Sequence, residues 1–438
     1  MGAKMPAPVA NTPPHLGIAA RAAAYARGFT GLSGDVRRLL AAAMSLWVGI
    51  GIFGVLFNLY LIALGYSVAF VGLLAALSTV GQAAVSLVLS PLLRGWPART
   101  VMAAATALVA ITMAASAVFT QALPLAALVL LQGAGVAAAT IPSSPFLMEQ
   151  SRPAQRAHLF SAYTAATNLG SMAGSLISGL LPPLVGLFAL RGQVVAQDRL
   201  GLLLGAALVL VGTLSLARIG GERAEPEEGT EVPSANAGAP EGEEQTRADL
   251  VAMMAATACI ALSLGVVYPL LNVYFATVHH ASTATIGLLY AASGVCCTLG
   301  SLLGPVAARR GSLAGLVALR ALTAPILLLF WIHPALAVVC VAYIGRNILG
   351  QITGTLENAF TMERVQPRFR GAVANWRTFA FNAGWTVGSL VAGAAVARYG
   401  FDPAFVASGA LTVAGTLIWY RRFVRPRPQP AAEPATLL

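Results

Sequence analysis

Charged residues are scarce in this chain of 438 residues: they make up 10% of it, whereas about a quarter of an ordinary soluble domain is charged. Hydrophobic residues make up 57%. This composition argues against a water-soluble globular fold and predicts a protein that faces lipid. The formal net charge of +11 would suggest nucleic acid as a partner of a soluble protein. Here the basic residues lie between long apolar runs, which favours a membrane topology and no nucleic-acid partner.

Motifs for chemistry are also missing. The sequence contains no phosphate-binding loop of the Walker type and no hydrolase or kinase signature, so we expect neither an enzyme nor direct use of ATP. His279 and His280 are adjacent but lack a third ligand nearby, so we expect no metal and no cofactor. All the cysteines lie in apolar runs and are interpreted as small buried residues: Cys259, Cys296, Cys297 and Cys340.

Long apolar segments are what the sequence has in abundance. A helix needs about 20 mainly apolar residues to cross the hydrocarbon layer. Twelve segments meet this requirement: 39–62, 68–90, 101–120, 122–146, 158–182, 200–217, 250–275, 284–307, 313–332, 335–359, 371–396 and 402–420. The apolar piece 183–190 is expected to be a re-entrant or a surface helix. We therefore predict an all-α membrane protein with about twelve transmembrane helices.

The arginines set the orientation of these helices. With the N-terminus inside, the outer loops receive only Arg191, Arg199 and Arg398, and every inner loop is positive. This is the positive-inside bias of membrane proteins. We expect a multi-pass protein of the plasma membrane with both termini in the cytoplasm.

Five regions follow from composition. The segment 1–38 is interpreted as a cytoplasmic tail, in which Ile18 to Phe29 is expected either to lie on the membrane surface or to be loosely ordered. Residues 219–249, rich in Glu, Gly, Pro and Ala, are predicted to be a disordered acidic linker. Residues 423–438 are predicted to be a second disordered tail. Between these segments lie two six-helix bundles, 39–218 and 250–422.

An internal repeat relates the two bundles. Phe-Leu-Met-Glu at 146–149 recurs as Phe-Thr-Met-Glu at 360–363, an offset of 214 residues, and Pro, Arg, Thr, Asn and Gly matches follow at the same offset. Gly72 matches Gly287 at an offset of 215. Six spans return the chain to its starting side, so the bundles would be parallel copies related by an axis along the membrane normal.

This arrangement resembles the major facilitator superfamily. Gln132-Gly-Ala-Gly-Val-Ala137 resembles the fourth-helix motif of that family, and the glycine pattern from Gly170 to Gly179 resembles the fifth-helix motif of its antiporters. The usual acid is missing from the inner loops at Ser90–Arg99 and Gly304–Gly311. The resemblance implies alternating access, with a central cavity lined mainly by helices one, four, seven and ten.

Arg346 is the first candidate for the cavity. It lies about eleven residues from the outer end of span ten, close to the midplane, where an arginine needs a partner or a wet cavity. Two interpretations remain open: Arg346 binds an anionic group of the substrate, or it makes a structural ion pair or carbonyl contact. The other expected cavity residues are Asn347, Gln351, Gln132, Tyr268 and Trp47.

Further charged residues fall into two groups. Glu357 and Arg377 are at similar depths on neighbouring helices, which predicts a buried pair, with proton coupling by Glu357 as the alternative. The second group is expected at the cytoplasmic surface, where it would form a breakable latch or else remain solvated: Arg94, Glu149, Arg156, Arg309, Arg310, Glu363 and Arg370.

Polar residues inside the spans complete the candidates. One repeated set lies at the outer ends of spans one and seven, where a gate is expected: Asn58, Tyr60, Asn272 and Tyr274. Another set is expected to pack helices together: Asn168, Gly170, Gly174, Asn382, Gly384 and Gly388.

We therefore expect a monomeric secondary active transporter in the lipid bilayer, acting on a small organic solute that is anionic, zwitterionic or amphiphilic and coupled to a proton or another ion. The glycine pattern slightly favours efflux, and an uptake permease is the alternative. A different class also fits: a lipid-moving protein, or a sensor with a transporter fold that does not transport.

Overall fold

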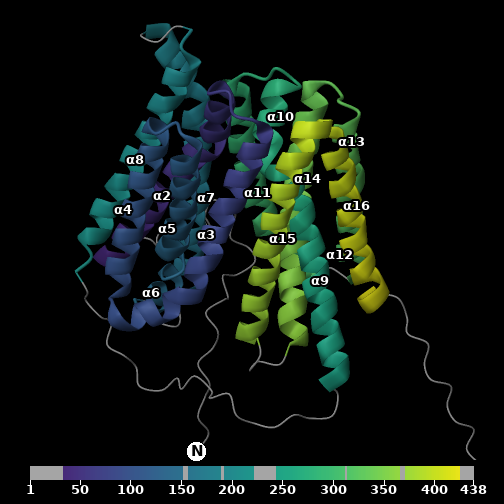
Figure 1. Cartoon of the computed structure of the whole chain (residues 1–438). Helices are drawn as coiled ribbons and strands as arrows, with labels where there is room; N and C mark the ends of the chain where they lie inside the picture. The colour runs from purple at the N-terminus through teal and green to yellow at the C-terminus, as the bar shows by residue number, and fades with distance from the viewer. Residues whose placement is uncertain are drawn as a thin grey trace, which may run out of the picture. The chain divides into compact units, whose positions relative to one another are not determined.

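The computed structural model describes the backbone of residues 33–150, 156–188, 192–220, 243–310, 313–365 and 370–424 (Figure 1). Throughout these ranges the chain is helical or turns between helices, and no strand occurs. The predicted surface helix at Ile18–Phe29, most of the acidic linker and nearly all of the second tail lie outside the described residues.

The helices of the first half follow the apolar runs closely. The structure has α2 (Gly34–Ala63), α3 (Val68–Gly95), α4 (Ala98–Val118), α5 (Ala122–Thr140), α6 (Ser143–Glu149), α7 (Arg156–Phe188) and α8 (Val194–Ala217). Ser33 begins α2 by accepting a hydrogen bond from the Val36 amide through its side chain, as a helix N-cap does.

The second half continues with a similar set. It contains α9 (Glu243–Val267), a 3₁₀ turn (Tyr268–Leu270), α10 (Leu271–Thr277), α11 (Thr283–Arg310), α12 (Leu313–Ala321), α13 (Thr323–Trp331), α14 (Leu336–Arg364), α15 (Arg370–Tyr399), α16 (Asp402–Trp419) and a final π turn (Tyr420–Val424). Among the described residues, eleven helical segments are long and apolar enough to cross a membrane, and Thr283–Thr298 of α11 is a shorter apolar one. The all-α membrane architecture is confirmed.

Several helix boundaries differ from those expected. The piece 183–190 is neither a re-entrant nor a separate surface helix as far as it is described, because α7 continues through Pro182 and Pro183 to Phe188. The sixth span begins at Val194 rather than at residue 200. The seventh span is broken into α9 and α10 at Tyr268–Leu270, where Pro269 has no backbone N–H to continue the helical hydrogen bonds.

The described chain forms two compact units. The first comprises Met1–Leu64, Val80–Glu231 and Thr283–Gly294, and the second comprises Gly65–Thr79, Val232–Ser282 and Val295–Leu438. These units are not continuous in sequence, because the beginnings of α3 and α11 pack with helices of the other half. In the second unit, a Cβ added to Gly72 would lie 2.6 Å from the Cα of Gly393, and in the first, one added to Gly287 would lie 2.6 Å from the Cα of Gly179.

Glycines also bring long helices together inside each unit. A Cβ on Gly170 of α7 would lie 2.5 Å from the Met44 carbonyl oxygen of α2. In the other unit, a Cβ on Gly384 of α15 would lie 2.6 Å from the Ala258 carbonyl oxygen of α9. Small residues at helix crossings permit this close approach of backbones, which is the usual way that membrane helices pack.

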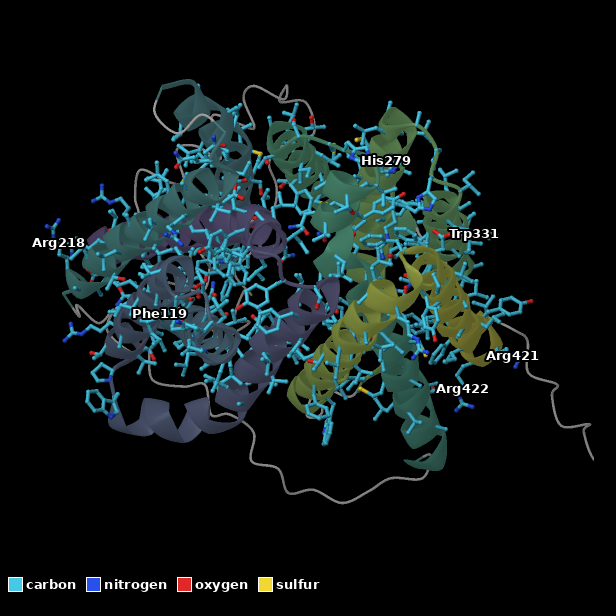
Figure 2. The ribbon with its side chains drawn as sticks, turned by 45° about the horizontal axis from the view of Figure 1, so that its top comes forward. Phe119, Arg218, His279, Trp331, Arg421 and Arg422 are labelled. Carbon is cyan, nitrogen blue, oxygen red and sulfur yellow. The ribbon has the colours of Figure 1, made fainter. Side chains whose placement is uncertain are left out.

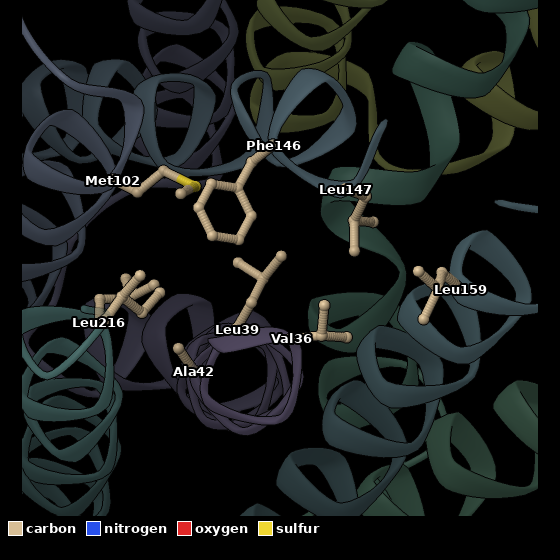
Figure 3. Close-up of a cluster of buried hydrophobic side chains, with 9 residues drawn as sticks. Val36, Leu39, Ala42, Met102, Phe146, Leu147, Leu159 and Leu216 are labelled. Atoms are coloured by element: carbon tan, nitrogen blue, oxygen red, sulfur yellow. The ribbon is translucent and has the colours of Figure 1, made fainter. Parts of the chain in front are cut away.

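The first unit contains a cluster of buried apolar side chains from several helices (Figure 3). Leu39 of α2 faces Phe146 of α6 and Met102 of α4, and none of these three side chains is more than 6% exposed. The cluster therefore joins the short helix α6 to the long helices α2 and α4.

Candidate functional site

Arg346 lies in α14 and meets the break in the seventh span. Its Nη1 donates a hydrogen bond to the Tyr268 hydroxyl, and its guanidinium lies 4.6 Å from the centre of the Tyr268 ring. The residue is only 9% exposed. Its Nε has no hydrogen-bond partner, and no carboxylate lies within ion-pair distance in the described part of the chain. Arg346 is therefore a buried cation without a described counter-charge.

Two further aromatic rings lie near Tyr268. The Tyr268 ring centre lies 6.3 Å from that of Tyr343 and 6.1 Å from that of Trp385. Such rings offer apolar contact and can attract a cation through their π faces. The break at Tyr268–Leu270 positions this group, because Tyr268 lies in the 3₁₀ turn between α9 and α10.

The other expected cavity residues are placed less uniformly. Asn347 is half-buried, whereas Gln351 is exposed. In the first unit, Gln132 is 6% exposed and its Oε1 has no described partner. Trp47 is half-buried beside α7, and its indole Nε1 is also without a described partner.

Glu357 lies between two arginines inside the second unit. Its carboxylate is 2.5 Å from Arg320 Nη2 of α12 and 3.3 Å from Arg377 Nη2 of α15. The Thr257 hydroxyl of α9 donates to the same carboxylate at 3.2 Å, so four helices meet there. The sequence indicated Glu357 and Arg377 but missed Arg320. A lone arginine in the apolar run 313–332 was the signal that could have found it.

The four expected gate residues are buried to different degrees. Tyr60 and Tyr274 are both fully buried, and each donates its hydroxyl hydrogen to a carbonyl oxygen, that of Ala117 at 3.0 Å and that of Phe330 at 3.1 Å. Asn272 is buried and its side-chain oxygen accepts a hydrogen bond from the Val273 amide, whereas Asn58 is half-buried.

The sequence did not indicate that ionisable residues gather around Tyr274. The ring nitrogens of His279 and His333 lie 3.0 and 3.3 Å from the Tyr274 hydroxyl, and His333 also lies 2.7 Å from Asp402. His333 and Asp402 are 69 residues apart, so no local pattern could have paired them. Within the described residues no group of three or more His, Cys, Asp or Glu is arranged to hold a metal ion.

Asp198 is a second residue that the sequence placed wrongly. The predicted sixth span began at residue 200 and left Asp198 outside it, but α8 begins at Val194 and Asp198 is only 2% exposed. The next residue, Arg199, lies 3.4 Å from the Tyr60 hydroxyl, to which it donates.

The residues of the cytoplasmic latch are mostly outside the described part. Glu149 ends α6 and is exposed. The side chains of the other six are not described: Arg94, Arg156, Arg309, Arg310, Glu363 and Arg370. The latch therefore stays a prediction.

The helix-packing candidates divide into glycines and amides. Gly170, Gly174, Gly384 and Gly388 all lie at close helix crossings. Asn168 and Asn382 are half-buried.

Comparisons with known proteins agree with this architecture. Three solved structures, each 14% identical to the chain, share its fold. A bacterial homologue of the human lysosomal transporter Spinster, inward-facing and unoccupied, gives a TM-score of 0.73 and covers 91% of this chain and 98% of its own. The nucleoside transporter NupG gives 0.70 with 90% and 100% covered, and a D-xylose–proton symporter gives 0.65 with 88% and 97%.

A family model matches the sequence, whereas no individual curated protein does. A comparison with curated proteins finds no match to this chain. The family model of the Major Facilitator Superfamily, however, matches residues 39–356 and again residues 253–437. These matches cover most of the chain, and the chain therefore belongs to the Major Facilitator Superfamily.

Proposed function

We propose that this protein is a secondary active transporter for a small organic solute with an anionic group, and that Arg346 binds that group during alternating access. The observation that carries the proposal is the buried guanidinium of Arg346, for which no counter-charge is described. An arginine at this depth is costly in a membrane protein and usually serves a substrate or an ion pathway. A zwitterionic solute or an amphiphile with an anionic head would satisfy the same chemistry.

The other buried arginines of the second unit support this assignment by contrast. Arg320 and Arg377 share the carboxylate of Glu357, so their charge is compensated in part within the protein. Among the described residues, the contacts of the Arg346 guanidinium are with the hydroxyl and the ring of Tyr268. A guanidinium that keeps donors free can hold a carboxylate or phosphate through paired hydrogen bonds.

The fold alone does not choose the solute. The neighbouring structures are named for nucleoside, D-xylose and lysosomal transport, which are chemically different tasks. We infer that the side chains around Tyr268 make the choice here. Efflux is favoured by the glycine pattern of α7, and uptake is the alternative. We also propose a parallel duplication of the halves, since equivalent glycines lie at equivalent crossings.

A ligand screen tests the Arg346 site. Purified protein is melted with a panel of carboxylates, phosphates, zwitterions and neutral analogues, together with Arg346→Gln, which installs the residue found 214 positions earlier at Gln132. Arg398→Gln is the matched control, because Arg398 is exposed in the same unit. We expect to find an anionic ligand that binds Arg346→Gln about 10- to 100-fold more weakly than it binds wild type. This loss corresponds to roughly 1.5–3 kcal/mol, the usual contribution of hydrogen bonds to a charged group. A ligand that binds Arg346→Gln as tightly as wild type would refute the site.

Transport direction needs a second assay. Protein reconstituted in one orientation into vesicles is offered the identified ligand from either side, with and without a pH gradient. Accumulation against the gradient assigns efflux or uptake. Movement of an acyl-chain amphiphile between leaflets, with no transport of soluble anions, would instead favour the lipid-moving alternative.

A further inference from the structure

Tyr274 is the centre of a cluster that the proposed function has not used. Its hydroxyl oxygen lies 3.1 Å from the Phe330 carbonyl oxygen, 3.0 Å from His279 Nε2 and 3.3 Å from His333 Nδ1. The other ring nitrogen of His333, Nε2, lies 2.7 Å from the Asp402 carboxylate. We call Tyr274, His279, His333 and Asp402 the histidine cluster. It ties α10 to the loop after α13 and to the beginning of α16.

The hydrogen atoms of this cluster can be counted. A tyrosine hydroxyl has one hydrogen, and a carbonyl oxygen can only accept, so the contact with Phe330 uses that hydrogen. Both histidine nitrogens that face the hydroxyl must then carry hydrogens of their own. His333 therefore donates from Nδ1 to Tyr274, and its Nε2 faces a carboxylate. A neutral His333 ring beside an ionised Asp402 carboxylate has one proton too few to make all four contacts. The contacts are complete only when the pair His333–Asp402 binds one additional proton.

We propose that His333, together with Asp402, binds a proton from the aqueous phase, and that this proton completes the contacts that hold α10 in its described position. The proton comes from water, forms an N–H bond on the His333 ring, and leaves by the same route. The proposal stands on the cluster geometry, and only its link to transport rests on the function proposed for Arg346.

The proton site is open to solvent. The side chains of His333 and Asp402 are 36% and 51% exposed, so the proton can exchange with water. On the predicted topology this water is outside the cell. His279 and Trp331 lie toward one end of the second unit, away from Arg421 and Arg422 (Figure 2). The cluster would therefore sense the outer pH.

The backbone gives a second observation. His333 has φ of 45° and His280 has φ of 51°, in the left-handed region that glycine usually occupies. The loop between α2 and α3 contains a glycine in the same region of backbone conformation, Gly65, with φ of 89°. Side chains in such strained positions are often kept for a function.

The other ionisable groups near His333 are compatible with a positive charge on His333 and a neutral ring on His279. Burial, His333 and His280 together lower the pKa of His279, so His279 donates to Tyr274 as a neutral ring. The ionisable groups described around His333 are thus Asp402 from α16, Tyr274 from α10, and His279 with His280 from the following loop. Asp402 is the one acid among them.

The short helix α10 connects this site to Arg346. Tyr274 is six residues after Tyr268, about 9 Å along a helix, and Tyr268 accepts the hydrogen bond of Arg346. When His333 loses its proton, its neutral ring has a single N–H: either Nδ1–H stays on Tyr274 and the contact with Asp402 is lost, or Nε2–H stays on Asp402 and Tyr274 loses a donor. In both cases α10 is held less firmly and the position of Tyr268 is less fixed.

The melting temperature of the full-length protein tests the proton site without any substrate. Wild type, His333→Gln and Asp402→Asn are melted between about pH 6 and pH 8, the range in which histidine ordinarily titrates. Tyr60→Phe is the matched control, because Tyr60 makes the same carbonyl contact in the first unit with no described histidine beside it. We expect the melting temperature of wild type to be several degrees higher than that of His333→Gln at about pH 6, and the difference to be much smaller at about pH 8. The difference between wild type and Tyr60→Phe should be the same at both pH values.

Two results would overturn the proposal. One is a difference between wild type and His333→Gln that does not change with pH. The other is a proton uptake by His333, followed by NMR of the labelled rings, that is unaffected by Asp402→Asn. If the site exists but no anionic ligand is found for Arg346, the melting data still hold and only the proposed function fails. If a ligand is found, its affinity should depend on pH in wild type and not in His333→Gln.

Discussion

Tyr60 and Tyr274 are separated by 214 residues and make the same hydrogen bond, from a fully buried hydroxyl to a carbonyl oxygen near the end of a neighbouring helix. Their surroundings differ. Tyr60 has Arg199 at 3.4 Å, whereas Tyr274 has two histidines. The two halves therefore share the same neutral hydrogen bond between a tyrosine and a carbonyl oxygen, while the ionisable residues beside that bond differ.

The same contrast is found where Glu357 meets Arg377. The equivalent residues 214 positions earlier are Ser143 and Tyr163, and their hydroxyls share a neutral hydrogen bond of 3.0 Å. Burial raises the cost of an unpaired charge far more than that of an unpaired hydroxyl. Equivalent substitutions should therefore have unequal effects on stability.

We predict that Glu357→Gln destabilises the protein by about 3–5 kcal/mol, because it leaves Arg320 and Arg377 buried without their shared carboxylate. Ser143→Ala should cost only about 1 kcal/mol, the usual value of one neutral hydrogen bond. Melting of both variants in detergent compares the two costs. Equal costs would show that Glu357 is not the charge that holds these four helices together.

We predict that Gly170→Ala destabilises the first unit by roughly 1–3 kcal/mol, because the added methyl group would overlap the Met44 carbonyl oxygen of α2. That atom belongs to the backbone and cannot move without shifting the helix. Gly54→Ala on α2 is the control, since no atom lies within 4 Å of its added Cβ. It should gain about 0.5–1 kcal/mol of helix stability. The order of melting temperatures, Gly54→Ala above wild type above Gly170→Ala, is the test.

Much of this architecture could be predicted from the sequence because its cause is local. Each long apolar run must cross the bilayer as a helix, and the glycine positions of α7 and α15 were visible as a repeated pattern. The depth of Glu357 and Arg377 followed from counting residues along two helices. These predictions needed only the helical rise and the offset of 214 residues.

The missed residues depend on tertiary contacts. His333 and Asp402 come from different loops, and only the fold brings them within 2.7 Å. Asp198 was placed in a loop because charged residues end an apolar run, although in the folded unit its side chain is buried. The break at Pro269 was hidden by the apolar residues on both sides of it, which kept the hydropathy high.

We predict that Tyr268→Phe weakens the binding of an anionic ligand about 2- to 10-fold, less than Arg346→Gln does. The ring under the guanidinium remains, but the hydroxyl that orients Arg346 is lost, so more side-chain entropy must be lost on binding. Isothermal titration with the ligand found in the screen measures the change. An affinity equal to or higher than that of wild type would mean that Tyr268 competes with the ligand for Arg346.

Replacing His279 should change the pH dependence of stability in the direction opposite to replacing His333. Burial and the neighbouring histidines lower the pKa of His279 in the folded protein, whereas in the unfolded chain it titrates near about 6.5. As the pH falls through that value, the unfolded chain binds a proton that the folded chain refuses, and stability is lost. His279→Gln keeps a donor for Tyr274 but does not titrate, so its melting temperature should rise relative to wild type from about pH 7.5 to about pH 5.5. His333→Gln should fall relative to wild type over the same range. If both variants moved in the same direction, at least one of the two histidines would have been assigned the wrong charge state.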